Sequence, residues 1–260
     1  MKNKKAKNSL VIANWKMNLS FKKTLELTKD IKKRLSQKRI KGVKVVLCPS
    51  FPMLNEVKKI IKNSKIVLGA QDTFWEEKGP FTSAVSPLIL KEIGCQYVII
   101  GHSERRRYFK ETDDIVHKKV KAALRAGLIP VICVGETFSE RKEHRKDYVI
   151  IRQVSRALEG IKVKKENKVV IAYEPVWVIG SGQAVRPEEA EYTSKVILHR
   201  LFDLYSKKIV ENNFWIIYGG SVDSHIVKSF THQLDIEGVL VGGKSLRAKE
   251  FVNIVNQVAQ

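Results

Sequence analysis

Eight short apolar runs, rich in β-branched residues, recur along the 260-residue chain. The apolar positions in each run are continuous instead of alternating with polar ones, which is typical of strands buried on both faces. Segments with helical periodicity separate the runs. The predicted strands are 10–13, 43–48, 66–70, 97–101, 129–135, 169–173, 214–219 and 238–242, and the predicted helices are 21–39, 52–62, 86–93, 113–126, 140–158, 187–206, 224–230 and 248–258.

The strict alternation of strand and helix predicts a parallel sheet, because parallel neighbours need a crossover connection, usually a helix. Eight repeats favour a closed barrel over an open doubly wound sheet, which commonly has about five or six strands. The length of the chain is that of one such barrel. We therefore expect an α/β protein with a (β/α)8 barrel fold, folded as a single domain over residues 1–260.

Hydrophobic residues make up 43% of the chain and charged residues 29%, which is the balance of a globular protein with material for a core. The Lys-rich N-terminus has only the apolar stretch 10–13, too short for a signal peptide or a membrane span. Cys48, Cys95 and Cys133 are odd in number and far apart, so they fit neither a disulfide framework nor a Cys-x-x-Cys metal site. We expect buried free thiols, a cytoplasmic protein and no membrane contact.

The net charge is +21, and it is unevenly distributed. Residues 1–44 hold 15 Lys and Arg but only two acids, Glu26 and Asp30. Such a segment either binds an anionic partner such as nucleic acid or forms a solvated basic helix face. Trp15 and Phe21 are the only aromatic residues in this run and do not interleave it as a series of stacking platforms would, and we therefore favour the solvated face over a nucleic-acid partner.

Distinctive polar residues follow five of the predicted strands. In a barrel of this class the active site is built from the loops at the carboxyl ends of the strands, so these residues are candidates for one common site. The segments are NWKMN at 14–18, GHSERR at 101–106, YEPVW at 173–177, YGGS at 218–221 and GGKS at 242–245.

The residue types in these segments suit proton transfer on a phosphorylated carbonyl compound. Glu174 offers a general base for a carbon-bound proton. Lys16 can neutralise developing negative charge, and Asn14 and His102 can donate hydrogen bonds to oxygens that become negative. A helical turn starting at Ser103 would disfavour a charged imidazole at His102, so a neutral His102 is our hypothesis.

Glycines after the seventh and eighth strands let backbone N–H groups approach a phosphate closely. Residues 238–245 also match the G-x-x-x-x-G-K-[ST] pattern of a P-loop. We interpret this match as accidental, because 239–241 are the apolar strand itself. Residues 175–183 form an apolar loop bounded by glycine, which predicts a lid that excludes water from the site.

The five segments, in this order and spanning nearly the whole chain, resemble the triosephosphate isomerase family. The resemblance implies the TIM-barrel fold and a cofactor-free, metal-free isomerase of glycolysis and gluconeogenesis that interconverts dihydroxyacetone phosphate and D-glyceraldehyde 3-phosphate. It implies Glu104 as a supporting carboxylate beside Lys16. It also implies that the catalytic residues are Asn14, Lys16, His102 and Glu174. The residues implied to bind the phosphate are Gly180, Ser221, Gly242 and Gly243.

The resemblance further implies a homodimer, with the loop 71–86 inserted into the partner and Thr82 reaching the neighbouring site. Several residues depart from the family pattern. Ala84 stands where an intersubunit partner of Arg105 is common, Lys244 adds charge near the phosphate glycines, and the lid carries Val178, Ser181 and Gln183. Another phosphate-binding barrel enzyme, and a nucleic-acid-binding role for the basic N-terminal third, remain the alternatives.

Overall fold

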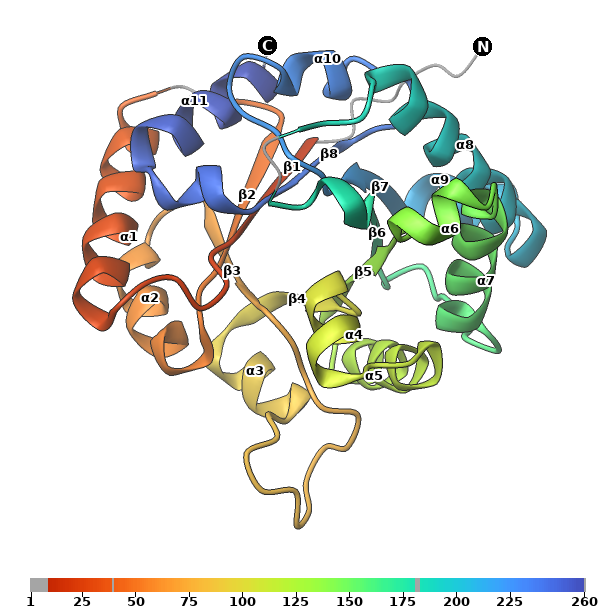
Figure 1. The fold of residues 1–260 in the computed structure, drawn as a ribbon. Helices are drawn as coiled ribbons and strands as arrows, with labels where there is room; N and C mark the ends of the chain where they lie inside the picture. Colours follow the sequence, from red (N-terminus) through yellow and green to blue (C-terminus); the bar gives the residue numbers. More distant parts are fainter. Residues whose placement is uncertain (1–8, 39, 181–182, 260) are drawn as a thin grey trace.

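The computed structural model describes residues 9–38, 40–180 and 183–259. Eight strands form a closed barrel in sequence order, and every pair of neighbours is parallel. Helices surround the barrel as an outer ring (Figure 1). The predicted (β/α)8 barrel is therefore confirmed. The strands are β1 Ser9–Asn14, β2 Val43–Cys48, β3 Ile66–Ala70, β4 Cys95–Ile100, β5 Ile129–Val134, β6 Val169–Tyr173, β7 Phe214–Tyr218 and β8 Gly238–Val241.

The helices begin at residues that suit a helix start. Ser20, Ser86 and Thr112 each accept a backbone N–H of the first turn that follows. Pro187 occupies the first turn of its helix, where a missing N–H costs nothing. The α-helices are α1 Phe21–Ser36, α2 Leu54–Ile61, α3 Pro87–Ile93, α4 Ser103–Phe109, α5 Asp113–Arg125, α6 Phe138–Lys142, α7 Lys146–Leu158, α8 Pro187–Leu204, α9 Lys207–Asn213, α10 Val227–Thr231 and α11 Ala248–Val258, and the 3-10 turns are η1 Phe51–Met53, η2 Val176–Val178 and η3 Gly243–Leu246.

Several of the predicted helices were wrong in extent. The helix expected over 224–230, for example, begins at Val227. The helix expected over 140–158 is split into α6 and α7, because His144 adopts a left-handed conformation with a φ of 56°. The capping box of Thr137 and Glu140 starts the first piece. The helix expected to reach residue 206 ends at Leu204, and a separate helix, α9, follows it. The helix expected over 21–39 ends at Ser36, and its predicted last residue, Arg39, lies outside the described residues.

The strands bury both faces, which explains their continuous apolar runs. Side chains alternate along a strand, so Leu10 and Ile12 belong to the cluster inside the barrel, whereas Val11 and Ala13 pack against the helices. All three cysteines are buried and free, as expected. No described helix has the length and apolar character needed to cross a membrane.

Candidate active site

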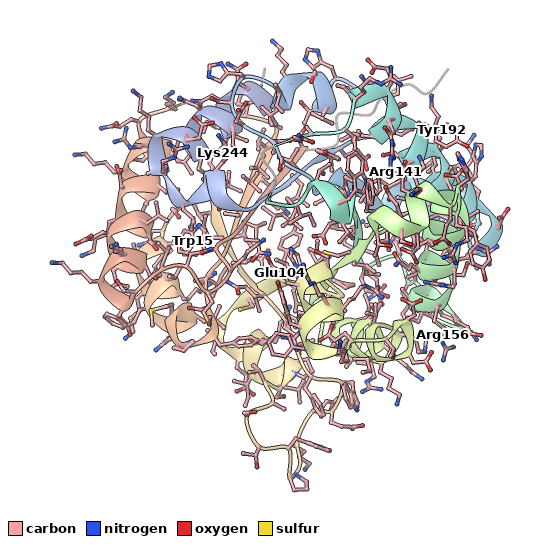
Figure 2. The ribbon with its side chains drawn as sticks, viewed as in Figure 1. Trp15, Glu104, Arg141, Arg156, Tyr192 and Lys244 are labelled. Carbon is pink, nitrogen blue, oxygen red and sulfur yellow. The ribbon has the colours of Figure 1, made fainter. Side chains whose placement is uncertain are left out.

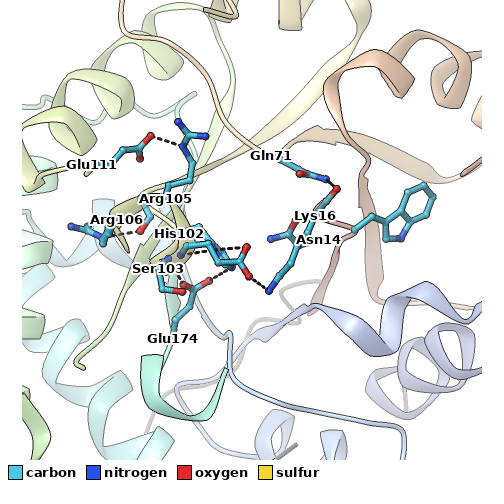
Figure 3. Close-up of polar contacts among 12 residues, drawn as sticks. Asn14, Lys16, Gln71, His102, Ser103, Arg105, Arg106, Glu111 and Glu174 are labelled. Carbon is cyan, nitrogen blue, oxygen red and sulfur yellow. Dashed lines mark hydrogen bonds and ion pairs between the residues drawn. The ribbon is translucent and has the colours of Figure 1, made fainter. Parts of the chain in front are cut away.

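Asn14, Lys16, His102 and Glu174, predicted from the strand ends, lie together at one mouth of the barrel (Figure 3). Parallel strands end at the same edge of a sheet, and closing the sheet into a barrel turns that edge into a ring. Glu104 lies toward the centre of this ring, whereas Arg156 lies on the outer helices (Figure 2). The fold therefore gathers residues that are far apart in the sequence, such as Asn14 and Glu174, which are 160 positions apart.

Lys16 is held in a conformation that non-glycine residues adopt rarely, with a φ of 52°. Its backbone N–H donates to Asn14 Oδ1 over 3.2 Å, and Gln71 Nε2 donates to its carbonyl oxygen over 2.8 Å. Its ammonium nitrogen lies 2.6 Å from Glu104 Oε1. The Lys16 ammonium group is thus held in the mouth by contacts with Asn14, Gln71 and Glu104, and the backbone of Lys16 is strained locally.

His102 caps the amino end of α4. Its Nδ1 accepts the backbone N–H of Glu104 over 3.2 Å. A ring nitrogen that accepts a hydrogen bond carries no proton, so this geometry suits a neutral imidazole with its hydrogen on Nε2. That Nε2 lies 3.4 Å from Glu174 Oε1. The hypothesis of a neutral, hydrogen-bond-donating His102 remains a prediction, now with a geometric basis.

Glu174 follows β6 directly and is 1% exposed. Its Oε2 accepts the backbone N–H of Ser103 over 3.2 Å. Its Oε1 is buried and has no hydrogen-bond partner among the described residues. Buried carboxylate oxygens are nearly always satisfied, so an unsatisfied one beside His102 is an unusual feature of this site.

Two glycines leave room for Glu174. A β-carbon at Gly135 would clash with the Glu174 carbonyl group, and one at Gly219 would lie 2.8 Å from Glu174 Cγ. Both glycines follow strands that neighbour β6, where side chains would otherwise fill the mouth. The position of the Glu174 carboxylate therefore depends on the absence of a β-carbon at Gly135 and at Gly219.

We predict that Gly219→Ala lowers kcat about 100-fold without unfolding the protein. The added methyl group displaces the Glu174 side chain, and a misplacement of about 1 Å at a reacting group has an effect of that size. Steady-state kinetics and a thermal melt of the same preparation check the prediction. An unchanged kcat would mean that the carboxylate moves freely at no cost to the reaction.

The site includes groups that the sequence did not single out. Cys133, on β5, is buried beside Glu174, and burial first and the carboxylate second raise the pKa of this thiol well above its usual value. Ser103 contributes only its backbone, and Gln71 also bonds the Cys48 carbonyl oxygen. The only sequence signal that could have identified Gln71 is its position at the end of a strand. Ser103 has no such signal, because it contributes a backbone N–H, which every residue except proline has.

The residues expected at the phosphate end lie on three separate segments. Ser221 Oγ donates to the Val178 carbonyl oxygen over 3.1 Å and so joins the β7 turn to the lid segment. A β-carbon at Gly242 would lie 3.7 Å from Lys16 Cε, so this turn adjoins the ammonium group, and Gly243 starts η3. Gly180 is exposed, with a φ of 76° that favours glycine.

Two sequence features near this end have clear outcomes. Lys244 Nζ lies 3.9 Å from Asp223 Oδ2, so part of its charge is offset by a neighbouring loop. The P-loop-like segment begins with β8 itself, and a β-carbon at Gly238 would clash with the Leu10 backbone. The structure confirms that 239–241 are strand, which supports the interpretation of this match as accidental.

The first half of the predicted lid is anchored to the barrel. Residues Val176–Val178 form the turn η2, and Val178 is fully buried. Trp177 Nε1 donates to Glu136 Oε1 over 2.9 Å, and the Arg141 guanidinium lies 4.5 Å from the Trp177 ring centre. Of the altered lid residues, Ser181 lies outside the described residues, whereas Gln183 is exposed.

Glu136 gives a pH-dependent prediction. Burial raises the pKa of this carboxyl group above its usual value, against the opposing effects of Trp177 and Arg141. A carboxyl group with a raised folded-state pKa destabilises the fold increasingly as pH rises from its unfolded-state pKa toward its folded-state pKa. We expect the stability of Glu136→Gln relative to wild type to increase as pH rises above about 4.3, the usual pKa of a glutamate. Urea unfolding over a pH series measures this difference, and a pH-independent difference would contradict the shift.

A buried charge cluster lies behind α4. Lys119 contacts Glu111, and its Nζ lies 2.6 Å from Asp72 Oδ1. Arg105 bonds both acids, with Nη2 2.9 Å from Asp72 Oδ2 and Nε 2.5 Å from Glu111 Oε1. Arg105 thus has two acidic partners within its own chain, although Ala84 offers it none. The cluster ties the loop after β3 to α4 and α5.

Fold and site together define a (β/α)8-barrel enzyme that carries a carboxylate, an imidazole and an ammonium group at its mouth. The triosephosphate isomerase family model matches residues 9–258. The chain belongs to this family and is an isomerase. Similar proteins include triosephosphate isomerases of Caldanaerobacter subterraneus, 44% identical over 95% of this chain and 98% of the relative, and of Dictyoglomus turgidum, 41% identical over 96% and 99%.

Proposed function

We propose that the protein interconverts dihydroxyacetone phosphate and D-glyceraldehyde 3-phosphate, as a step of glycolysis and gluconeogenesis. The observation that carries the proposal is the unpartnered Oε1 of Glu174, 3.4 Å from His102 Nε2. Family membership supplies the substrate. We propose further that the whole chain acts as one domain in the cytoplasm, without a metal or an organic cofactor.

In the proposed mechanism, Glu174 removes the proton from carbon one of the ketone and so becomes a carboxylic acid. The electron pair moves onto the carbonyl oxygen and leaves an enediolate. Lys16, His102 and Asn14 stabilise the negative oxygens, because fixed donors in a site shielded from water act strongly on developing charge. A proton moves between the two oxygens, and Glu174 returns its proton to carbon two.

Binding of the phosphate is assigned to Gly180, Ser221, Gly242 and Gly243. Support comes from the glycine turns after β7 and β8, whose backbone N–H groups suit an anion. Glu104 is assigned a supporting role, through its 2.6 Å contact with the Lys16 ammonium group. Closure of the segment that begins at η2 would exclude water and strengthen these interactions.

An assay of the purified wild-type protein tests the proposal. We expect rapid interconversion of the two triose phosphates, followed in both directions with coupled enzymes, and no dependence on added metal or nucleotide. A panel of other phosphorylated aldoses and ketoses addresses the alternative of a different barrel enzyme. Turnover of one of these compounds, with the triose phosphates inert, would reject the proposal.

We also propose a homodimer, with Thr82 reaching the partner's site. Support comes from the loop between β3 and α3, which projects from the body of the barrel (Figure 1). Large apolar side chains are exposed on this loop and on the neighbouring helices, where a partner would cover them: Phe81, Leu88, Ile89, Tyr108 and Phe109. Sedimentation equilibrium is expected to give twice the 29.7 kDa chain mass, and a monomer at micromolar concentration would contradict it.

A further inference from the structure

Basic residues are concentrated in one part of the barrel. Residues 20–66 hold 14 Lys and Arg against three acids, whereas residues 67–260 hold 29 against 24. A protein that is basic only because of its general composition would spread this excess evenly. The segment 20–66 forms α1, β2 and α2, which are consecutive around the ring (Figure 1).

Most of these cations lie toward the amino-terminal end of the strands, away from the catalytic mouth, because α1 and α2 each run from the mouth toward that end. Val45 pairs with Ile66, so Lys44 and Lys65 lie at the starts of adjacent strands. Lys32 Nζ bonds the carbonyl oxygens of Ile60 and Lys62 and holds the ends of α1 and α2 side by side. We name the exposed lysines of α1 after its first two turns, and those of the segments after α1 and α2, the basic face, which comprises Lys29, Lys33, Lys38, Lys41, Lys44, Lys62 and Lys65.

The acids of this region do little to neutralise the basic face. Asp30 is bonded to Arg34 over 2.7 Å, and Glu56 to Lys59 over 2.6 Å, neither of which belongs to the face. Glu26 is then the remaining carboxylate of residues 20–66. Within the described part of the chain, the lysines of the basic face form no ion pair, so their charge is available to a partner.

A polar groove of about 810 Å³ continues from the basic face toward α11. It lies between the segment after α1, the segment before α10, and α11, which packs against α1. None of the described residues that line it is acidic, and none is Phe, Tyr or Trp. Its polar lining includes two lysines, an imidazole and three carboxamides, namely Lys38, Lys41, His225, Asn253, Asn256 and Gln257.

We infer that the basic face and this groove bind the phosphate backbone of double-stranded nucleic acid. Lysines neutralise phosphates along a chain, and imidazole and carboxamide groups bond phosphate and sugar oxygens. The lack of aromatic residues among the described residues that line the groove argues against stacked single strands, yet it leaves backbone binding to a duplex intact. The extent of the face beyond the groove favours a polymer over a small phosphorylated ligand.

Two triple variants test the inference. Lys33→Gln/Lys38→Gln/Lys41→Gln removes three charges from the basic face. Lys162→Gln/Lys164→Gln/Lys165→Gln removes three exposed charges before β6, on the opposite side of the barrel from β2. Each is titrated with a labelled duplex of about 20 base pairs, as DNA and as RNA, by fluorescence anisotropy over a salt series. Thermal melts confirm that both variants fold.

We expect the wild type to bind duplex at about 150 mM salt, with the basic-face variant at least about 10-fold weaker and its log–log salt slope smaller by about 2 to 3. The control variant should stay within about twofold of wild type. Equal losses in both variants would overturn the inference in favour of net charge alone. Absence of wild-type binding at this salt, or binding only to phosphatidylserine vesicles, would overturn it as well.

Discussion

Glu174→Gln is expected to lower kcat for triose phosphate interconversion by about 100- to 10,000-fold, the usual cost of losing a general base. The carboxamide keeps the shape of the side chain, and its oxygen can still accept the Ser103 N–H that Oε2 accepts now. It cannot take up a proton at neutral pH. The loss should therefore fall on kcat, with a small change in KM.

The matched control is Glu166→Gln, the same substitution at an exposed carboxylate in the segment before β6. Its kcat should equal that of the wild type. Circular dichroism melts of both variants separate a chemical effect from a folding defect. A Glu174→Gln enzyme that retains most of its kcat would show that another group removes the proton.

Lys119→Met is expected to destabilise the protein by about 3–5 kcal/mol, the cost of breaking a buried ion pair by removing one partner. Lys119 is 3% exposed, and its ammonium group contacts both Asp72 and Glu111. Without it, two buried carboxylates share Arg105 alone. Equilibrium unfolding in urea at pH 7 measures the loss.

The exposed neighbour Lys121 provides the control, because Lys121→Met should change stability by less than about 0.5 kcal/mol.

The loss in the Lys119→Met variant should shrink in acid. Burial raises the pKa of Asp72, whereas Lys119 acts to lower it, so removing Lys119 raises it further. A carboxyl group with a raised folded-state pKa destabilises the fold fully at pH values above that pKa. The destabilisation disappears below the pKa of the unfolded state, which is about 3.9 for an aspartate. Unfolding at pH 5 should therefore reveal a smaller deficit than at pH 7. An equal deficit at both values would mean that the cost arises from packing alone.

The position of this cluster links stability to the proposed site. Arg105 lies on α4, one position after Glu104 and three after His102, and Asp72 lies one position after Gln71, which bonds the Lys16 carbonyl oxygen. The ion pairs therefore tie together two segments that each carry a residue of the mouth. We expect the Lys119→Met enzyme to lose activity at temperatures below its unfolding transition.

The hydrophobic pattern by itself determined the architecture. The predicted strands 43–48, 66–70 and 169–173 match β2, β3 and β6 residue for residue, because strands buried on both faces carry an unbroken apolar signal. The same pattern located the candidate site, because Lys16, His102 and Glu174 each follow a strand and the barrel brings strand ends together. The division of 140–158 escaped prediction, because a single left-handed residue, His144, interrupts an otherwise helical sequence.

Contacts between side chains were decided only by the tertiary structure. Three such contacts involve residues 33 to 72 positions apart in the sequence. They are the 3.4 Å distance between His102 and Glu174, the space that Gly219 leaves for Glu174, and the ion pair of Arg105 with Asp72. Strand order and helix packing set such distances, and no local propensity encodes them. The charge of the chain illustrates the same division. Its excess of lysine is visible in the composition. The joining of helix and strand-start lysines into one face depends on the pairing of β2 with β3 and on the packing of α1 against α2.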